Sequence, residues 1–209
     1  MKPAVIVVDM VKDNLKEGSS HPIVQEGRAI IPNLHRLLEE GRKRGFPIIF
    51  ACDSFLKEDF IFKGKVKARA LRGTKGSEVV DDLKPELMDM ILPKRRFSAF
   101  FKTDLDQTLR TFGVDTIIIT GIMSEVCVLM TAMDGLSHDF YVILLEDCTA
   151  SKDNESHQAF LGLYRDFSLS LHPLLRIMPL DEFLKELSLK ERVQVVQDSI
   201  DQGYRERIG

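Results

Sequence analysis

Cys127 has the sequence setting in this chain that best suits nucleophilic chemistry. It lies in GIMSEVCV, residues 121–128, which follows a β-branched run and opens a helical pattern. Ser124 is expected to cap that helix by accepting a hydrogen bond from a free amide of the first turn. Cys127 would then lie near the third helical position, where free N–H groups favour a thiolate and lower its pKa. The same amides could stabilise an oxyanion formed by attack on a carbonyl carbon.

Two charged residues at the ends of apolar runs could assist such a thiol. Asp9 ends AVIVVD, and Lys94 directly follows DMILP. A carboxylate can accept the thiol proton, and an ammonium can stabilise the charge that results. The alternative is that both are structural strand-end charges and that Cys127 is a small buried apolar residue. None of the five histidines has a setting that clearly places it beside this group.

The other two cysteines, Cys52 and Cys148, are expected to be structural, because each lies in or beside an apolar run. The three cysteines form no C-x-x-C pair, and their odd number suggests no disulfide framework. We therefore expect a reducing, cytoplasmic setting.

Composition excludes several classes of function. The net charge is −3, and no basic tract is long enough to neutralise a phosphate backbone, so no nucleic-acid partner is expected. No apolar run reaches the roughly 20 residues that cross a bilayer, so no membrane partner is expected, and the first apolar run is too short for a signal peptide. A small-molecule substrate is the remaining expectation.

The elements that must position these residues alternate between strands and helices. Apolar runs without polar alternation, typical of parallel strands, occupy residues 4–9, 47–52, 89–93, 116–120, 140–145 and 174–178. Helical patterns occupy residues 27–45, 104–112, 124–136 and 155–166. This order predicts a three-layer α/β/α domain around a parallel sheet, in which ligands bind at the carboxyl ends of the strands. Asp9, Asp53, Lys94, the 121–127 segment and Asp147 all lie at those ends.

Two segments fall outside the alternation. Residues 54–79 are a long charged stretch, and such a stretch in a compact domain is usually functional or mobile. Residues 180–209 are expected to form one or two amphipathic helices, so we divide the chain into a domain at 1–183 and a helical extension at 184–209. No G-x-G-x-x-G, P-loop or G-x-S-x-G motif is present, which argues against dinucleotide, nucleotide and serine-hydrolase chemistry.

Three sequence blocks resemble the isochorismatase-like cysteine hydrolases, and they occur in the order and spacing of that family. They are VIVVDM at 5–10, KRRFSAFFKTDLDQTLRTFGVDTIIITGIMSEVCV at 94–128, and LLEDCTAS at 144–151 with His157. The likeness covers roughly residues 3–183. It implies a six-stranded parallel sheet in Rossmann-like order, usually in dimers or tetramers, so a homo-oligomer is expected.

The resemblance also implies roles for individual residues. Asp9 matches the general base, Lys94 matches the lysine of K-x-x-[FY]-S-A-F, and Cys127 matches the nucleophile. A cis peptide is implied at Ile122–Met123, with the amides of Met123 and Cys127 as the oxyanion hole. The expected reaction is cleavage of a C–N bond in a small amide, carbamoyl or ureido compound through an acyl-enzyme.

Departures from the family pattern argue against one branch of the family, the nicotinamidases. Nicotinamidases carry Asp-x-His and a further His that bind a metal, whereas Asp53 is followed by Ser54 and Phe55, and no His lies between 36 and 137. We therefore expect no histidine-based metal site and no cofactor. The usual Gln and Phe of the first block are Val11 and Asn14, which changes the substrate pocket.

RALRGTKGSE, residues 69–78, resembles the N-carbamoylsarcosine amidase-like branch. Arg69 and Arg72 could bind a substrate carboxylate, and Phe100 could form a wall of the pocket; the alternatives are a solvated basic loop and a core aromatic residue. Two other functions remain open: an enol-ether hydrolase in which Asp9 is the acid and Cys127 is incidental, and a non-catalytic binding member of the fold.

Overall fold

The sheet of the protein has six parallel strands in the order β3-β2-β1-β4-β5-β6, which confirms the expected Rossmann-like order. The computed structural model describes residues 1–16, 18–19 and 22–191. The strands are β1 (Pro3–Val8), β2 (Ile48–Asp53), β3 (Met90–Lys94), β4 (Thr116–Ile122), β5 (Tyr141–Ala150) and β6 (Leu175–Met178). Every residue of β1, β2 and β4 is buried, as expected for strands covered on both faces.

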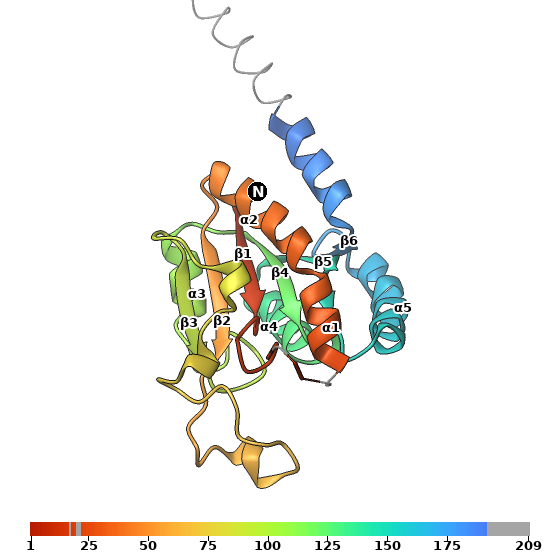
Figure 1. The fold of residues 1–209 in the computed structure, drawn as a ribbon. Helices are drawn as coiled ribbons and strands as arrows, with labels where there is room; N and C mark the ends of the chain where they lie inside the picture. Colours follow the sequence, from red (N-terminus) through yellow and green to blue (C-terminus); the bar gives the residue numbers. More distant parts are fainter. Residues whose placement is uncertain (17, 20–21, 192–209) are drawn as a thin grey trace, which may run out of the picture.

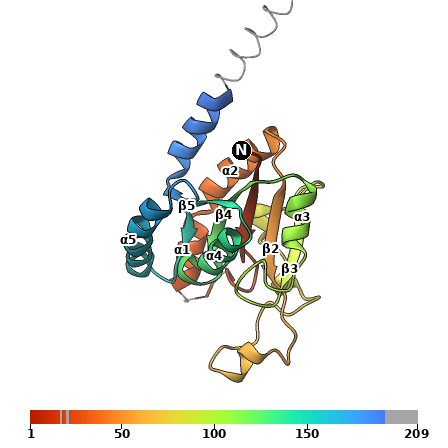
Figure 2. The same ribbon diagram turned by 180° about the vertical axis from the view of Figure 1, so that it is seen from behind.

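Helices cover both faces of the sheet (Figures 1 and 2). One face packs against α1 (Pro22–Ala29), α2 (Ile31–Lys43) and residues 180–191. The other face packs against α3 (Leu105–Thr111), α4 (Leu129–Ser137) and α5 (Asn154–Leu171). Alternate residues of β1, such as Val5 and Ile6, contribute to the two separate apolar cores. The expected three-layer α/β/α architecture is therefore confirmed.

Two boundaries differ from the prediction for physical reasons. The single helix expected at 27–45 is two helices, because Pro32 lacks an N–H group and breaks the pattern at Ile30. The strand expected at 140–145 continues to Ala150, because its register against β4 shifts after Ile119 and then resumes as Gly121 pairs with Thr149.

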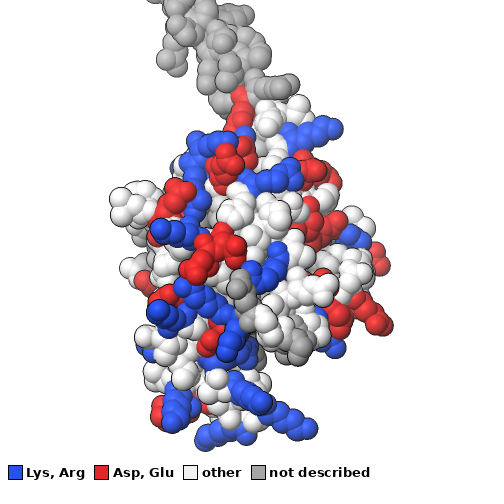
Figure 3. Space-filling view, viewed as in Figure 1, with Lys and Arg blue, Asp and Glu red and all other residues white. Residues whose placement is uncertain are grey.

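The segment at 54–79 is a long excursion that extends away from the sheet (Figure 1) and carries many Lys and Arg side chains (Figure 3). Its regular structure is limited to the short 3-10 helices η1 (Phe60–Lys63) and η2 (Lys75–Ser77), and η3 (Asp81–Leu83) follows it.

The C-terminal helix begins at residue 180, before the boundary expected between residues 183 and 184. Residues 180–191 are helical, and Leu180, Phe183 and Leu187 are buried against the α1/α2 core. This helix is therefore packed as part of the domain at least to residue 187. The remainder of the expected extension, residues 192–209, lies outside the described residues.

Candidate active site

Four neighbouring strands bring candidate catalytic side chains to one edge of the sheet. Asp9 directly follows β1, Asp53 ends β2, Lys94 ends β3, and Cys127 lies just beyond β4. All four strands are parallel, so their carboxyl ends meet at this edge. The topology thus joins residues that lie up to 118 positions apart in the chain.

Lys94 lies between two carboxylates in the protein interior. Its Nζ is 2.7 Å from Asp9 Oδ2 and 2.8 Å from Asp53 Oδ1, and its side chain is fully buried. Nζ also donates a hydrogen bond of 3.1 Å to the main-chain carbonyl of Arg96. Asp9 Oδ1 accepts a hydrogen bond of 2.8 Å from the N–H of Asp53. These contacts fix the ammonium and both carboxylates in one rigid cluster.

The charges of this cluster change its proton affinities. Burial and the neighbouring Asp53 raise the pKa of Asp9 to about 7, although Lys94 and a hydrogen bond with Cys127 act in the opposite direction. Burial disfavours the charged form of Lys94, but Asp9 and Asp53 outweigh that effect and hold its pKa above the usual value. A buried carboxyl that titrates near neutral pH is suited to general base catalysis.

The thiol of Cys127 contacts Asp9 by a side-chain hydrogen bond. Burial, followed by the negative charge of Asp9, raises the thiol pKa well above its usual value, while Lys94 lowers it only in part. The expectation that the helix start lowers this pKa is therefore wrong for the free protein. The physical reason is that desolvation and a carboxylate neighbour outweigh the favourable amides.

The backbone around Cys127 differs from a simple helix start. The Ile122–Met123 peptide is cis, as the resemblance implied. Residues Ser124–Val128 form one π-helical turn before α4 begins, and the N-terminal cap is Met123 without a side-chain hydrogen bond. The N–H groups of Val126 and Val128 both donate to the Met123 carbonyl. The prediction that Ser124 caps this helix is therefore wrong.

Ser124 instead makes a hydrogen bond with a histidine from α5. Its hydroxyl is 2.9 Å from Nδ1 of His157, and the other ring nitrogen of His157 is 3.0 Å from the carbonyl of Glu146. A carbonyl only accepts, so Nε2 carries the proton and, in the neutral ring, Ser124 donates to Nδ1. Ser124 is fully buried, so it serves to hold the Cys127 turn against α5 rather than to cap it.

The expected substrate-binding residues do not gather at the thiol. Arg69 donates to the side chain of Asn14 at 2.8 Å and lies 3.9 Å from Asp53 Oδ2, so it borders the cluster. Arg72 donates to the hydroxyl of Ser54 and lines a separate cavity beside β3.

Phe100 lies in the apolar core, where its ring stacks on His138 and contacts Phe140 just before β5. His138 lies at the C-terminal end of α4, whereas Cys127 lies before the start of that helix. The expectation that Phe100 forms a wall of the substrate pocket is therefore corrected to a core role, since its side chain points into the α3/α4 layer.

Two contributors to the cluster had no role assigned from the sequence. The sequence shows Asp53 only as a polar strand end, whereas in the structure it provides the second carboxylate for Lys94. Asn14, noted only as a departure from the family pattern, donates to the Asp9 carbonyl at 3.1 Å and accepts from Arg69. Their strand-end and near-strand positions were the available signals.

Comparison with known proteins places this cluster in a family. The model of the isochorismatase domain matches residues 3–170, which is most of the chain. The chain belongs to the isochorismatase family. The match spans Asp9, Lys94 and Cys127 together, and it accords with the topology described above.

Isochorismatase-family relatives include proteins with different described activities. A probable inactive nicotinamidase of Arabidopsis thaliana is 33% identical over 166 residues, which cover 75% of this chain and 84% of that protein. The ureidoacrylate amidohydrolase RutB of Serratia proteamaculans is 30% identical over 170 residues, which cover 70% of this chain and 68% of that protein.

Solved structures of the isochorismatase family superpose over nearly the whole domain. An isochorismatase-like hydrolase from Alkaliphilus metalliredigens has a TM-score of 0.79 and 33% identity, covering 90% of this chain and 100% of that one. N-carbamoylsarcosine amidase from Thermoplasma acidophilum has a TM-score of 0.72 and 28% identity, covering 87% and 98%.

The described residues contain neither a cluster of metal ligands nor a membrane-spanning helix. Within residues 1–16, 18–19 and 22–191, no three His, Cys, Asp or Glu side chains gather so that they could hold a metal ion. Over the same ranges, no helix is long and apolar enough to cross a membrane.

Proposed function

We propose that the protein is a cysteine hydrolase that cleaves a C–N bond of a small amide, carbamoyl or ureido compound. The observation that carries the proposal is the buried cluster in which Asp9 contacts both the Lys94 ammonium and the Cys127 thiol. The relatives described as ureidoacrylate amidohydrolase and N-carbamoylsarcosine amidase support the substrate class.

In the proposed reaction, Asp9 acts as the general base. It takes the thiol proton as the Cys127 sulfur attacks the carbonyl carbon of the substrate. The N–H groups of Met123 and Cys127 donate to the oxyanion that forms. Collapse of this intermediate breaks the C–N bond, the leaving amine takes the proton from Asp9, and a thioester remains. Asp9 then removes a proton from water as the water attacks the thioester. The C–S bond breaks, the Cys127 sulfur takes that proton from Asp9, and the acid and the free thiol are released.

Lys94 holds the cluster together through this cycle. Its ammonium stays charged because its pKa is held high by the two carboxylates. It orients the Asp9 carboxylate and stabilises negative charge that appears on the thiol during attack. We propose that Arg69 borders the substrate, because it is half exposed and lies beside Asp53.

An acyl-enzyme trap tests the proposal. The protein is mixed with a panel of small amides, carbamoyl and ureido compounds, quenched in acid and measured by intact-protein mass spectrometry. We expect an added acyl mass on Cys127, loss of turnover in Cys127→Ala and Asp9→Asn, and retention of turnover in Cys52→Ala. Full turnover of these compounds in Cys127→Ala would show that the thiol is not the nucleophile, and turnover of an enol-ether substrate by that variant would indicate enol-ether chemistry. Selective ligand binding without turnover on any compound would indicate a non-catalytic member.

We further propose a cytoplasmic homo-oligomer. The three cysteines are unpaired, which suits a reducing compartment. Helix α5 exposes Leu163 and Leu169 at 67% and 75% of their surfaces, and exposed apolar patches often mark subunit contacts. Light scattering coupled to gel filtration measures the assembly, and a monomer at micromolar concentration would contradict this part.

A further inference from the structure

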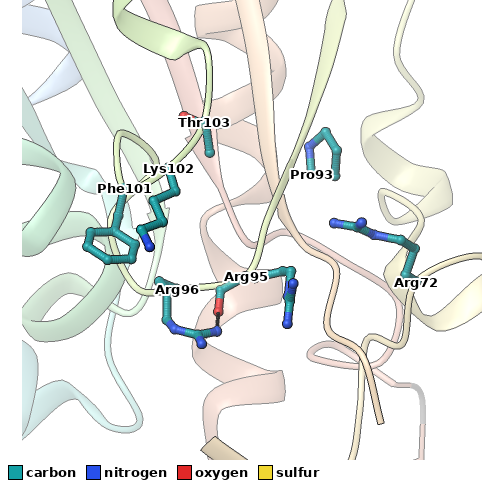
Figure 4. A pocket seen from close by; sticks show the side chains of 7 residues that line it. All are labelled: Arg72, Pro93, Arg95, Arg96, Phe101, Lys102 and Thr103. Carbon is teal, nitrogen blue, oxygen red and sulfur yellow. Dashed lines mark hydrogen bonds between the residues drawn. The ribbon is translucent and has the colours of Figure 1, made fainter. Parts of the chain in front are cut away.

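A cavity distinct from the Asp9–Lys94–Cys127 cluster lies outside the edge strand β3. It has a volume of about 360 Å³, and Figure 4 shows the side chains that line it: Arg72, Pro93, Arg95, Arg96, Phe101, Lys102 and Thr103. Ligand pockets in proteins span roughly 300–1,000 Å³, so this one suits a small organic molecule better than a single ion.

This cavity is separate from the thiol. β3 is the last strand on its side of the sheet, and β2 and β1 lie between it and β4, which leads to Cys127. At about 4.8 Å between neighbouring strands, the backbones of β3 and β4 are roughly 14 Å apart. Pro93 and Lys94 are successive strand residues, so their side chains point to opposite faces. The Lys94 side chain reaches the catalytic cluster, whereas Pro93 lines the cavity.

The cavity is strongly cationic. Its lining contains four basic side chains and no acidic one. Arg95 and Arg96 both pair with the buried carboxylate of Asp59. Their guanidinium nitrogens lie 2.5 and 3.3 Å from Asp59 Oδ1. The hydrogen bond from Arg95 is the main reason that the pKa of Asp59 lies well below its usual range. This carboxylate is therefore ionised, and it already pairs with Arg95 and Arg96.

Two further cations of the cavity have no acidic partner. Among the described residues, neither Arg72 nor Lys102 forms an ion pair. Arg72 donates to the neutral hydroxyl of Ser54 at 3.2 Å. The Nζ of Lys102 lies 5.7 Å from the ring centre of Phe101. With one carboxylate against four cations, about three positive charges in the cavity are left to be balanced from solution.

We propose that this cavity is an accessory binding site for a small organic dianion with a flat apolar part. Guanidinium groups bind carboxylate and phosphate oxygens with matching geometry, and an ammonium adds a point charge. The half-exposed ring of Phe101 and the ring of Pro93, on opposite sides in Figure 4, provide apolar surface for the remainder of the ligand. The site needs neither the thiol nor Asp9, so it stands independently of the proposed reaction.

A matched series of probes tests the charge requirement. Phthalate, benzoate and benzamide share one ring and carry two, one and no negative charges. Isothermal titration should give the strongest binding for phthalate, weaker binding for benzoate and none for benzamide. Added KCl should weaken phthalate binding, because screening reduces attraction between exposed charges.

Variants test the location. We expect the double variant Arg72→Gln/Lys102→Gln to weaken phthalate binding at least about tenfold, which is the effect of losing about 1.4 kcal/mol. Lys63→Gln is the matched control, since this lysine also lies over a phenylalanine ring, Phe60, outside the cavity. Circular dichroism confirms that each variant is folded. The Cys127→Ser variant should bind phthalate as the unmodified protein does.

Three results would overturn the proposal. The first is no saturable binding of phthalate, succinate or inorganic phosphate up to about 10 mM, where any specific site should fill. The second is equal phthalate affinity in the folded double variant and in the unmodified protein. The third is loss of binding in Cys127→Ser, which would assign the anion to the thiol site.

Discussion

Replacing Lys94 by Met should destabilise the protein, and the loss should grow with pH. The ammonium lies 2.7 and 2.8 Å from two buried carboxylates. At an effective dielectric constant of about 20, each contact is worth roughly 6 kcal/mol of attraction, most of it offset by desolvation of the three charges. Removal of one partner from a buried ion pair typically costs about 3–5 kcal/mol, and we expect a loss in that range near pH 6.

The pH dependence follows from Asp9. Its pKa of about 7 in the folded protein exceeds the value of 3.8 expected when unfolded, so its contribution to stability is complete below about pH 4 and is lost as the pH rises through 7. Without the ammonium, which lowers this pKa, Asp9 would keep its proton at higher pH. The variant would then lose about a further 1.4 kcal/mol per pH unit above about 7, relative to the unmodified protein.

Urea unfolding at pH 6 and pH 8.5 measures this difference. The control is Lys43→Met, because its ion pairs with Glu39 and Glu40 are exposed and should contribute little to stability at either pH. An equal loss in the Lys94 variant at both pH values would refute the assigned coupling between Lys94 and Asp9.

Iodoacetamide labelling of the same variant reports on the thiol. Lys94 lowers the pKa of Cys127, so its removal should slow alkylation, by about tenfold for each unit of pKa. Cys52 is the internal control, because its side chain is buried in β2, whereas Cys127 is only partly buried. Unchanged labelling of Cys127 would show that the ammonium does not act on the thiol.

Further predictions concern the base, the backbone, the C-terminal helix and metals. The kcat/KM value should rise with pH to a plateau with a midpoint of about 7 as Asp9 loses its proton; a flat profile would exclude it as the base. Gly121→Ala should prevent folding or cost at least about 4 kcal/mol, because φ is +98° and a Cβ would lie 2.1 Å from the Val8 carbonyl; Gly162→Ala, in open space, is the control. Phe183→Ala should cost about 3–5 kcal/mol in urea unfolding; a loss under about 1 kcal/mol would show that this helix is not docked. EDTA should leave turnover unchanged, and inhibition reversed by zinc would contradict that expectation.

The fold was predictable because buried parallel strands leave a simple pattern. Each of the six apolar runs became a strand, with ends displaced by only a few residues except in β5. That displacement came from a register shift against β4, which depends on two strands at once and leaves no mark on either alone. The break before α2 could have been found, since Pro32 lay within the predicted helix.

The candidate site was predictable in its members but not in its energetics. Asp9, Lys94 and Cys127 were chosen from strand-end positions and the family pattern, and the fold brings them together. The pKa of Cys127 is expected from the sequence to fall, yet it rises, because the thiol is buried and lies near Asp9. Neither burial nor the distance to Asp9 can be obtained from the sequence alone. Phe100 was expected at the pocket but lies in the core, because side-chain direction in an aperiodic segment cannot be inferred from spacing.

The charges of the cluster, and the position of its titrating proton, explain how a thiol with a high pKa could still be the proposed nucleophile. One ammonium and two carboxylates leave a net charge of −1 in a buried site, and burial penalises that charge. A proton on Asp9 relieves the penalty most directly, which is why its pKa approaches 7. When Asp9 is ionised, its hydrogen bond with Cys127 provides the path by which the thiol proton can leave during attack. The sulfur therefore need not rest as a thiolate, because the base that raises its pKa is also the group that removes its proton.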